Sequence, residues 1–155
     1  MADIKHLLRI EASPERVYLA LTTAEGIRKW WTKHADLEEY VGGTGQFRFN
    51  YEKTVVTDVT ILQLQKNELV SWQVVSSFRP EQDGTTISFV LKSDKSGTFV
   101  FLTQAGFKEP DETYALMTTG WAYYLVSLQQ YLETGEGAPS PDVRFDRMIR
   151  PPKHP

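Results

Sequence analysis

The chain has 155 residues, a formal net charge of −3 and no cysteine, so we expect one domain without disulfides or thiolate metal sites. It carries no basic stripe, which argues against nucleic acid as a partner. No apolar run reaches the roughly 18–20 residues of a membrane span, and the N-terminus lacks a secretory signal pattern, so we expect a cytoplasmic protein.

The N-terminal segment predicts one strand followed by two short helices. Apolar residues alternate over residues 4–10, which is typical of a half-buried strand. Ser13 followed by a proline is typical of a helix start. Thr23 is expected to cap a second short helix that ends with Trp30 and Trp31. Two helices joined this closely are expected to form a bent pair.

The middle of the chain predicts an antiparallel meander, because apolar and polar residues alternate with period two between short turns. A connector with a short strand at residues 35–38 and a glycine-rich turn comes first. That turn lacks the lysine and the following helix of a phosphate loop. The predicted strands lie at residues 46–51, 55–65, 70–74, 87–91 and 99–104.

Residues 111–133 predict the longest helix, since apolar side chains recur there at steps of three or four. Asp111 suits the N-cap and Gly135 suits the stop. Gly120 costs about 1 kcal/mol against alanine in a helix, so we expect it to permit close approach to the sheet or the first helices. This helix alone is long enough to cover an antiparallel sheet, which predicts an α+β fold.

The tail at residues 136–155 contains five of the eight prolines and is expected to be extended and partly disordered. Tyr123 and Val126 lie off the apolar stripe of the long helix. They are expected to contact either the docked tail, which we favour, or a second copy in a homodimer.

Several segments resemble a known family. Residues 12–22, ASPERVYLALT, are followed by Trp30-Trp31, and residues 102–107, LTQAGF, are followed by Gly120-Trp121. Together these segments resemble the START-like (SRPBCC, polyketide cyclase-like) superfamily. More narrowly, they resemble the activator of heat-shock protein 90 ATPase homologue family. The resemblance covers residues 4–133.

The resemblance implies a helix-grip fold over residues 1–135. In this fold a curved antiparallel sheet of about six or seven strands is wrapped around a long C-terminal helix, and an apolar cavity lies between the sheet and the helix. It implies no shared catalytic set and no cofactor. We expect no chaperone-binding domain before the fold, and therefore no chaperone partner. The residues expected to line the cavity are aromatic or apolar: Trp30, Phe47, Phe49, Tyr51, Trp72, Phe89, Phe101, Met117, Trp121 and Leu125. The sequence leaves open whether Trp30 or Trp31 faces it.

These observations favour a protein that binds a small apolar molecule without catalysis. One alternative is a cyclase-like or hydrolytic enzyme that uses His6, whose parity on the first strand points it inward, or a carboxylate–tyrosine pair. That pair would join Glu52 or Asp58 to Tyr51 or Tyr114. Another alternative is a chaperone ATPase cofactor or stress-response interaction module. Three scattered histidines predict no metal site.

Overall fold

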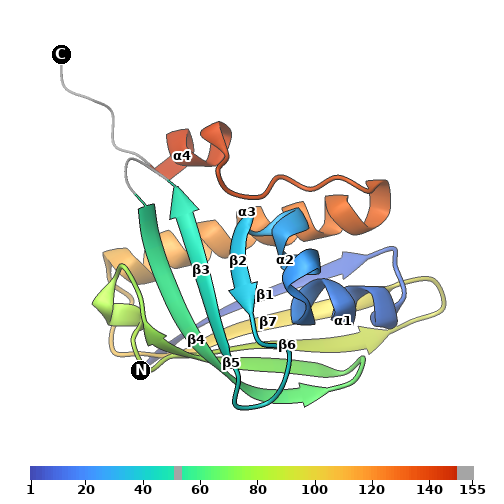
Figure 1. Ribbon diagram of the computed structural model, residues 1–155, viewed down its shortest axis with the longest axis horizontal. Coiled ribbons are helices and arrows are strands. Elements are labelled where there is room, and N and C mark those ends of the chain that lie inside the picture. The colour runs from blue at the N-terminus through green and yellow to red at the C-terminus, as the bar shows by residue number, and fades with distance from the viewer. Residues whose placement is uncertain (51–53, 150–155) are drawn as a thin grey trace.

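The computed structural model describes residues 1–50 and 54–149, and within them a curved antiparallel sheet supports four α-helices (Figure 1). The described strands form one seven-stranded sheet in the order β1-β7-β6-β5-β4-β3-β2, with every neighbouring pair antiparallel. Their bounds are β1 Ala2–Ile10, β2 His34–Leu37, β3 Thr44–Asn50, β4 Thr54–Gln65, β5 Leu69–Ser76, β6 Thr86–Ser93 and β7 Thr98–Phe107.

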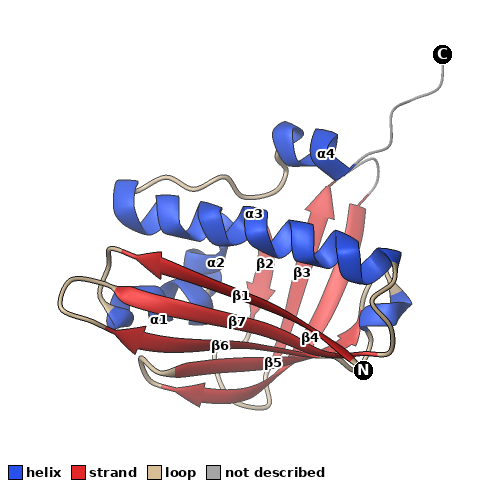
Figure 2. Ribbon diagram, turned by 180° about the vertical axis from the view of Figure 1, so that it is seen from behind, coloured by secondary structure: helices blue, strands red, loops and turns tan. Residues whose placement is uncertain are grey.

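The helices are α1 (Pro14–Thr22), α2 (Ala24–Trp30), α3 (Glu112–Thr134) and α4 (Val143–Ile149), with a 3-10 turn, η1 (Pro80–Gln82), between β5 and β6. Figure 2 shows α3 lying across the concave side of the sheet, with α4 beyond it. The predicted α+β helix-grip fold is therefore confirmed. None of the helices in the described ranges is both long and apolar enough to cross a membrane.

Helix α3 begins and ends where the sequence predicts. The Asp111 carboxylate accepts a hydrogen bond from the Tyr114 backbone N–H at 3.0 Å, which satisfies a donor in the first turn. Gly135 adopts the left-handed conformation, with φ of 93°, that commonly closes a helix. The apolar face of α3 then packs on the sheet.

The bent helix pair also forms as predicted, with Ser13 and Thr23 as N-caps. Gly26 explains how close the two helices lie. A Cβ at this position would sit 2.7 Å from both the Ala20 Cα and the Leu19 carbonyl oxygen. Both obstacles are backbone atoms, so a larger residue would push α1 and α2 apart.

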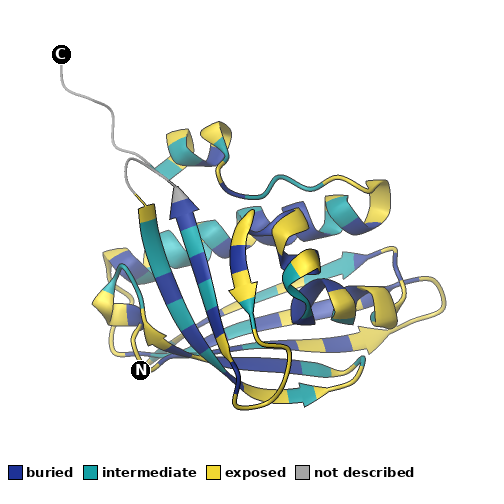
Figure 3. Ribbon diagram, viewed as in Figure 1, coloured by how far each residue is buried: buried dark blue, intermediate teal, exposed yellow. Residues whose placement is uncertain are grey.

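Strand parity separates a buried sheet face from an exposed one (Figure 3). On β6, Ile87, Phe89 and Leu91 are buried. On β7 the buried positions between Thr98 and Gln104 are the even-numbered ones, such as Leu102, whereas Phe101 is 41% exposed on the other face. The expectation that Phe101 lines an internal cavity is therefore wrong.

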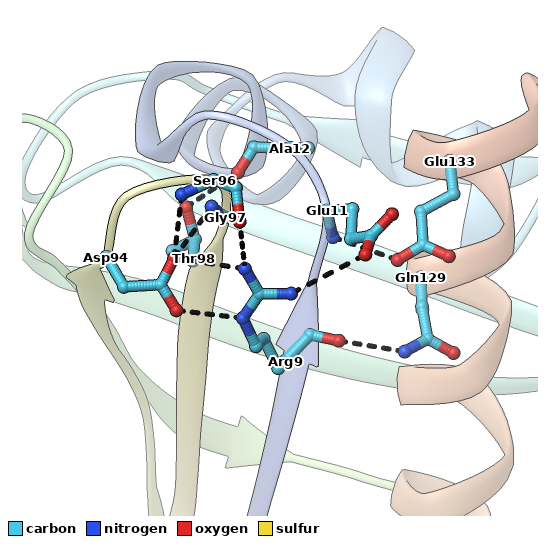
Figure 4. A network of polar contacts seen from close by, with 9 residues as sticks. All are labelled: Arg9, Glu11, Ala12, Asp94, Ser96, Gly97, Thr98, Gln129 and Glu133. Atoms are coloured by element: carbon cyan, nitrogen blue, oxygen red, sulfur yellow. Dashed lines mark hydrogen bonds and ion pairs between the residues drawn. The ribbon is translucent and has the colours of Figure 1, made fainter.

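A polar network fastens edge strand β1 to its surroundings (Figure 4). The Arg9 guanidinium donates to both carboxylate oxygens of Asp94, at 2.8 and 3.0 Å, in the turn between β6 and β7. These bonds from Arg9 hold the pKa of the Asp94 carboxyl well below its usual range. On the other side, Gln129 donates to the Arg9 carbonyl, and Glu133 accepts from the Glu11 backbone N–H. Residues far apart in sequence thus join at one end of the sheet.

The tail is more ordered than the sequence predicts, because residues 143–149 form α4. Asp142 accepts from the Arg144 N–H at 3.0 Å and so caps this short helix. Phe145 is 2% exposed and packs its ring 4.9 Å from those of Tyr123 and Tyr124. The tail therefore docks on α3 through Tyr123, as favoured from the sequence. Val126 remains 45% exposed.

Candidate functional site

A pocket of about 490 Å³ lies beside the N-terminal half of α3. This helix supplies one wall through Leu116, Met117, Gly120, Trp121 and Tyr124. These residues share one face of α3 because neighbours three or four positions apart lie side by side on a helix. That face borders the pocket. The pocket is thus a space that the grip between helix and sheet leaves unfilled.

Several other elements complete the wall. Strands β3 and β4 contribute Phe49, Val55 and Thr57, and the segment that leads into η1, together with η1 itself, contributes Phe78, Arg79 and Gln82. Helix α4 closes another side with Phe145, Asp146 and Ile149. Most of these side chains are apolar, so water in the pocket finds few hydrogen-bond partners. An apolar ligand that enters the pocket removes its own apolar surface from water, which favours binding.

Of the predicted cavity residues, Phe49, Met117 and Trp121 lie in this wall. Tyr51 lies outside the described residues. The remaining inward-facing ones are buried elsewhere in the core and do not line the pocket: Trp30, Phe47, Trp72, Phe89 and Leu125.

Trp31, and not the expected Trp30, lines the pocket, which decides the choice that the sequence leaves open. Trp30 is fully buried, and its indole N–H donates to the Ala20 carbonyl at 2.8 Å. Trp31, the C-cap of α2, lines the pocket instead. Its ring lies stacked near those of Trp72, at 5.9 Å between centroids, and Trp121, at 5.2 Å. Such aromatic pairs add about 0.5–1.5 kcal/mol each beyond area burial.

A buried polar chain lies behind Trp121. The indole N–H of Trp121 donates to Gln104 Oε1 at 2.8 Å. Gln104 Nε2 donates to Gln82 Oε1 at 3.1 Å and to Thr85 Oγ1 at 3.0 Å, and Thr85 Oγ1 donates to the Gln82 carbonyl at 2.6 Å. Sequence reasoning missed this chain. Its one signal was a glutamine at an inward position of β7, which needs partners when buried.

This hydrogen-bond network leaves one buried group without a partner. Gln82 is 4% exposed, and its Nε2 has no hydrogen-bond partner within residues 1–50 and 54–149. An unsatisfied buried donor costs about 1–3 kcal/mol. Gln82 forms part of the pocket wall, but its Nε2 is itself enclosed by the protein.

The charged groups of the wall are one guanidinium and one carboxylate. Arg79 Nη1 donates to Thr113 Oγ1 at 3.3 Å, and Arg79 Nη2 lies 3.7 Å from a carboxylate oxygen of Glu112. The opposite charge is Asp146 on α4. The formal charges of the wall therefore cancel.

Gly120 does not have the role expected of it. Among the described residues outside the backbone of α3 and the adjacent positions, a Cβ built at Gly120 would meet only Phe145 Cζ within 4 Å, at 3.6 Å, an ordinary van der Waals distance. Gly120 therefore faces α4 and the pocket, and close approach to the sheet or to α1 and α2 is not its purpose.

The candidate acid–base groups do not converge on the pocket. His6 faces α3 as its parity predicts, but its Nε2 lies 2.9 Å from Thr118 Oγ1 and the residue is not part of the wall. Asp58 accepts from Gln46 and Ser76, and Tyr114 donates to the Asp3 carbonyl. Glu52 lies outside the described residues. Among the residues that the structure describes, no three potential metal ligands cluster.

A family model described as "Activator of Hsp90 ATPase homolog 1-like protein" matches residues 11–133. The chain belongs to this family. No curated protein matches the chain significantly. The solution structure of the Aha1 dimer from Colwellia psychrerythraea is similar, with 40% identity and a TM-score of 0.77. The match covers 88% of this chain and all of that one.

More distant structures share the fold of this chain. A protein from Mesorhizobium loti has 23% identity and a TM-score of 0.76, with 85% of this chain and 97% of that chain covered. CalU16 from Micromonospora echinospora has 19% identity and a TM-score of 0.71, with 94% and 82% covered. The family predicted from the sequence is therefore confirmed, and these structures show that the fold is shared more widely.

Proposed function

We propose that this protein binds a small, largely apolar molecule in the pocket beside α3. The observation that carries the proposal is a space of about 490 Å³ with mostly apolar walls. Ligand sites commonly measure about 300–1,000 Å³ and combine such walls with a few polar groups. The cytoplasmic location expected from the sequence belongs to the same proposal, and cell fractionation would check it.

The proposed role is binding without catalysis. Catalysis by general acids and bases needs titratable groups within hydrogen-bond reach of one reacting site. The Arg79 guanidinium is already paired with Glu112 and Thr113, and His6 is bonded to Thr118 away from the pocket. These contacts favour a binding site over the enzymatic alternative.

The neutral fluorescent probe N-phenyl-1-naphthylamine tests the proposal. We expect saturable binding, and shifts in the ¹H–¹⁵N spectrum centred on residues 116–124 and on Phe145. Leu116→Trp places a large ring in the pocket and should weaken binding about tenfold or more. Val126→Trp is the matched control, because Val126 is an exposed apolar residue on the same helix. Binding that fails to saturate, or equal losses in both variants, would refute the proposed site.

A homodimer is a second proposal, supported by the dimeric Colwellia psychrerythraea relative. On the outer face of the sheet, Leu7 and Val90 pair with Phe101 from the two sides. The three side chains are 60%, 37% and 41% exposed, respectively, so they form a contiguous apolar row. We propose that a second copy covers this row.

Sedimentation velocity tests the dimer. The unmodified chain should sediment as a dimer, and Phe101→Lys should yield monomers because it places a charge in the apolar row. Val126→Lys changes the exposed apolar position on α3 and should leave the dimer intact. If Val126→Lys alone dissociates it, the interface lies on α3 and the outer-face proposal fails.

A further inference from the structure

We infer that the outward face of α4 docks on the surface of an anionic lipid bilayer, as a peripheral contact that does not span it. This face consists of two exposed apolar residues, Val143 and Met148, and two exposed cations, Arg144 and Arg147. None of the four lines the pocket, so the inference goes beyond ligand binding and does not depend on it.

The four residues share one side of α4. A helix turns by about 100° per residue, so their positions fall within an arc of about 140°. Phe145 and Ile149 lie on the opposite side and belong to the pocket wall, and Phe145 is 2% exposed. By contrast, the side chains of Val143 and Met148 are 68% and 53% exposed. The outward face therefore presents apolar surface that the fold itself does not bury.

The charges of α4 are divided between its two sides. Asp146 belongs to the pocket wall. The Asp142 carboxylate accepts hydrogen bonds from the Tyr123 hydroxyl and from the Arg144 backbone N–H. In the described part of the chain, the guanidinium groups of Arg144 and Arg147 form no salt bridge and no hydrogen bond. The outward face is therefore positive, although the whole chain has a formal net charge of −3.

The body of the protein holds this face in place. The Ser140 N–H donates to the Trp31 carbonyl at 2.8 Å, and the Lys33 N–H donates to the Ser140 carbonyl at 2.9 Å, so the chain is fastened just before α4. Burial of Phe145 fastens the helix itself. In both views of the fold, α4 lies at an outer margin of the molecule (Figures 1 and 2). An extended surface can approach α4 from that side, and docking requires no folding of the helix.

An anionic bilayer matches both components of the face. Apolar side chains of a surface helix are buried at the boundary between headgroups and acyl chains, and basic side chains are attracted to anionic lipids. Arginine suits this position, because its guanidinium binds phosphate through paired hydrogen bonds while its apolar stem packs against hydrocarbon. The sequence of residues 150–155 adds one arginine and one lysine and no acidic residue. An acidic protein or a nucleic acid would match the cations alone.

Co-sedimentation with lipid vesicles tests the inference. We expect the unmodified chain to bind vesicles of mixed phosphatidylcholine and phosphatidylglycerol and not to bind vesicles of phosphatidylcholine alone. Binding should weaken as the salt concentration rises from about 0.1 M to about 1 M, because the Debye length falls from about 10 Å to about 3 Å. Equal binding to both kinds of vesicle, or no binding to the anionic kind, would overturn the inference.

Paired substitutions on α4 locate the contact. Arg144→Gln combined with Arg147→Gln should weaken binding to the anionic vesicles about tenfold or more, because both cations near the lipid surface are lost. Val143→Ser combined with Met148→Gln should also weaken it about tenfold or more, because the apolar part of the contact is lost.

Lys92→Gln combined with Lys95→Gln is the matched control for the arginine pair. Both lysines are exposed at the end of β6 and in the turn after it, and the change in net charge is the same. Vesicle binding should be retained in this control. An equal loss in the lysine and arginine pairs would assign the attraction to net charge and exclude a specific contact through α4.

A dye at a single position tests the same contact without removing any cation. The chain has no cysteine, so Val143→Cys can be labelled at that position alone with the polarity-sensitive dye acrylodan. Its emission should shift to the blue on anionic vesicles. Acrylodan on Val75→Cys, at an exposed apolar position of β5, should show no shift. A shift at residue 75 without one at residue 143 would place the contact on the sheet and refute the inference.

The membrane contact and the proposed ligand site can fail separately. Binding of N-phenyl-1-naphthylamine, measured without vesicles, should be the same in the two α4 pairs as in the unmodified chain, because the pocket wall is intact in both. If this probe binds and the anionic vesicles do not, the membrane inference fails and the pocket stands. If the vesicles bind and the probe does not, the membrane contact stands and the proposed function fails.

Discussion

Replacing Gly120 by alanine should stabilise the protein. Glycine in the interior of a helix costs about 1 kcal/mol against alanine, because the unfolded glycine backbone has more freedom to lose. A glycine is retained without loss only where a Cβ would clash or the backbone needs positive φ. Apart from the adjacent residues and the backbone of α3 itself, the nearest described atom to a Cβ at Gly120 is Phe145 Cζ at 3.6 Å, and φ is not positive. No contact within residues 1–50 and 54–149 therefore opposes the gain in stability.

Urea unfolding measures the effect. With an m-value of about 1–3 kcal/mol per molar for a small protein, a gain of about 1 kcal/mol raises the midpoint by about 0.3–1 M. The m-value itself should not change. Gly26→Ala is the control, since its Cβ would lie 2.7 Å from two backbone atoms, and the midpoint should fall.

The reasoning is refuted if Gly120→Ala leaves the midpoint unchanged or lowers it. Such a result would mean that α3 and α4 cannot accommodate a methyl group at 3.6 Å. It would place Phe145 closer to the helix in solution than the structure does.

Three further predictions concern single contacts. Trp121→Phe removes the indole N–H that donates to the buried Gln104 Oε1, and it should lower the free energy of unfolding by about 1–3 kcal/mol. A loss smaller than the error of a denaturant unfolding experiment would contradict this hydrogen bond. Arg9→Met should destabilise the chain at neutral pH, where Asp94 with its depressed pKa is charged. The deficit should narrow as the pH falls below about 4, and a deficit independent of pH would count against the ion pair. Burial and a hydrogen bond to the tail raise the pKa of Tyr123 to about 12. The contribution of the neutral Tyr123 hydroxyl to folding stability should therefore be complete below about pH 10 and disappear toward pH 12. The difference in ultraviolet absorbance between the unmodified protein and Tyr123→Phe measures this titration, and a midpoint at the ordinary tyrosine pKa would contradict the prediction.

The sequence predicts those parts of the fold that local rules decide. Caps at Asp111 and Gly135 define α3, and strict alternation defines β6, because each depends on neighbours within a few residues. Residues 99–102 are all apolar, so period two cannot tell which side faces inward. The polar Gln104, which is buried, weakens the pattern further. The sequence pattern therefore places Phe101 on the wrong face of the sheet.

The candidate site is less predictable because it depends on contacts between distant segments. Trp30 and Trp31 are adjacent at the end of α2, and their side chains point in different directions. Packing against Trp121 and the sheet decides which of the two rings reaches the pocket. Helix α4 has seven residues and would be marginal alone, so its propensity gives little signal. Its formation depends on burying Phe145 between two tyrosines of α3.

Helix α4 also has a consequence for comparisons between relatives. The family model matches residues 11–133, yet Phe145, Asp146 and Ile149 form one side of the pocket. The shared region therefore builds an open trough, and a segment beyond it supplies the cover. A replacement of the cover alone would change the shape and charge of the enclosed space while every residue of the trough stayed the same. A ligand identified for one member carries over to another only when their covers match as well as their troughs.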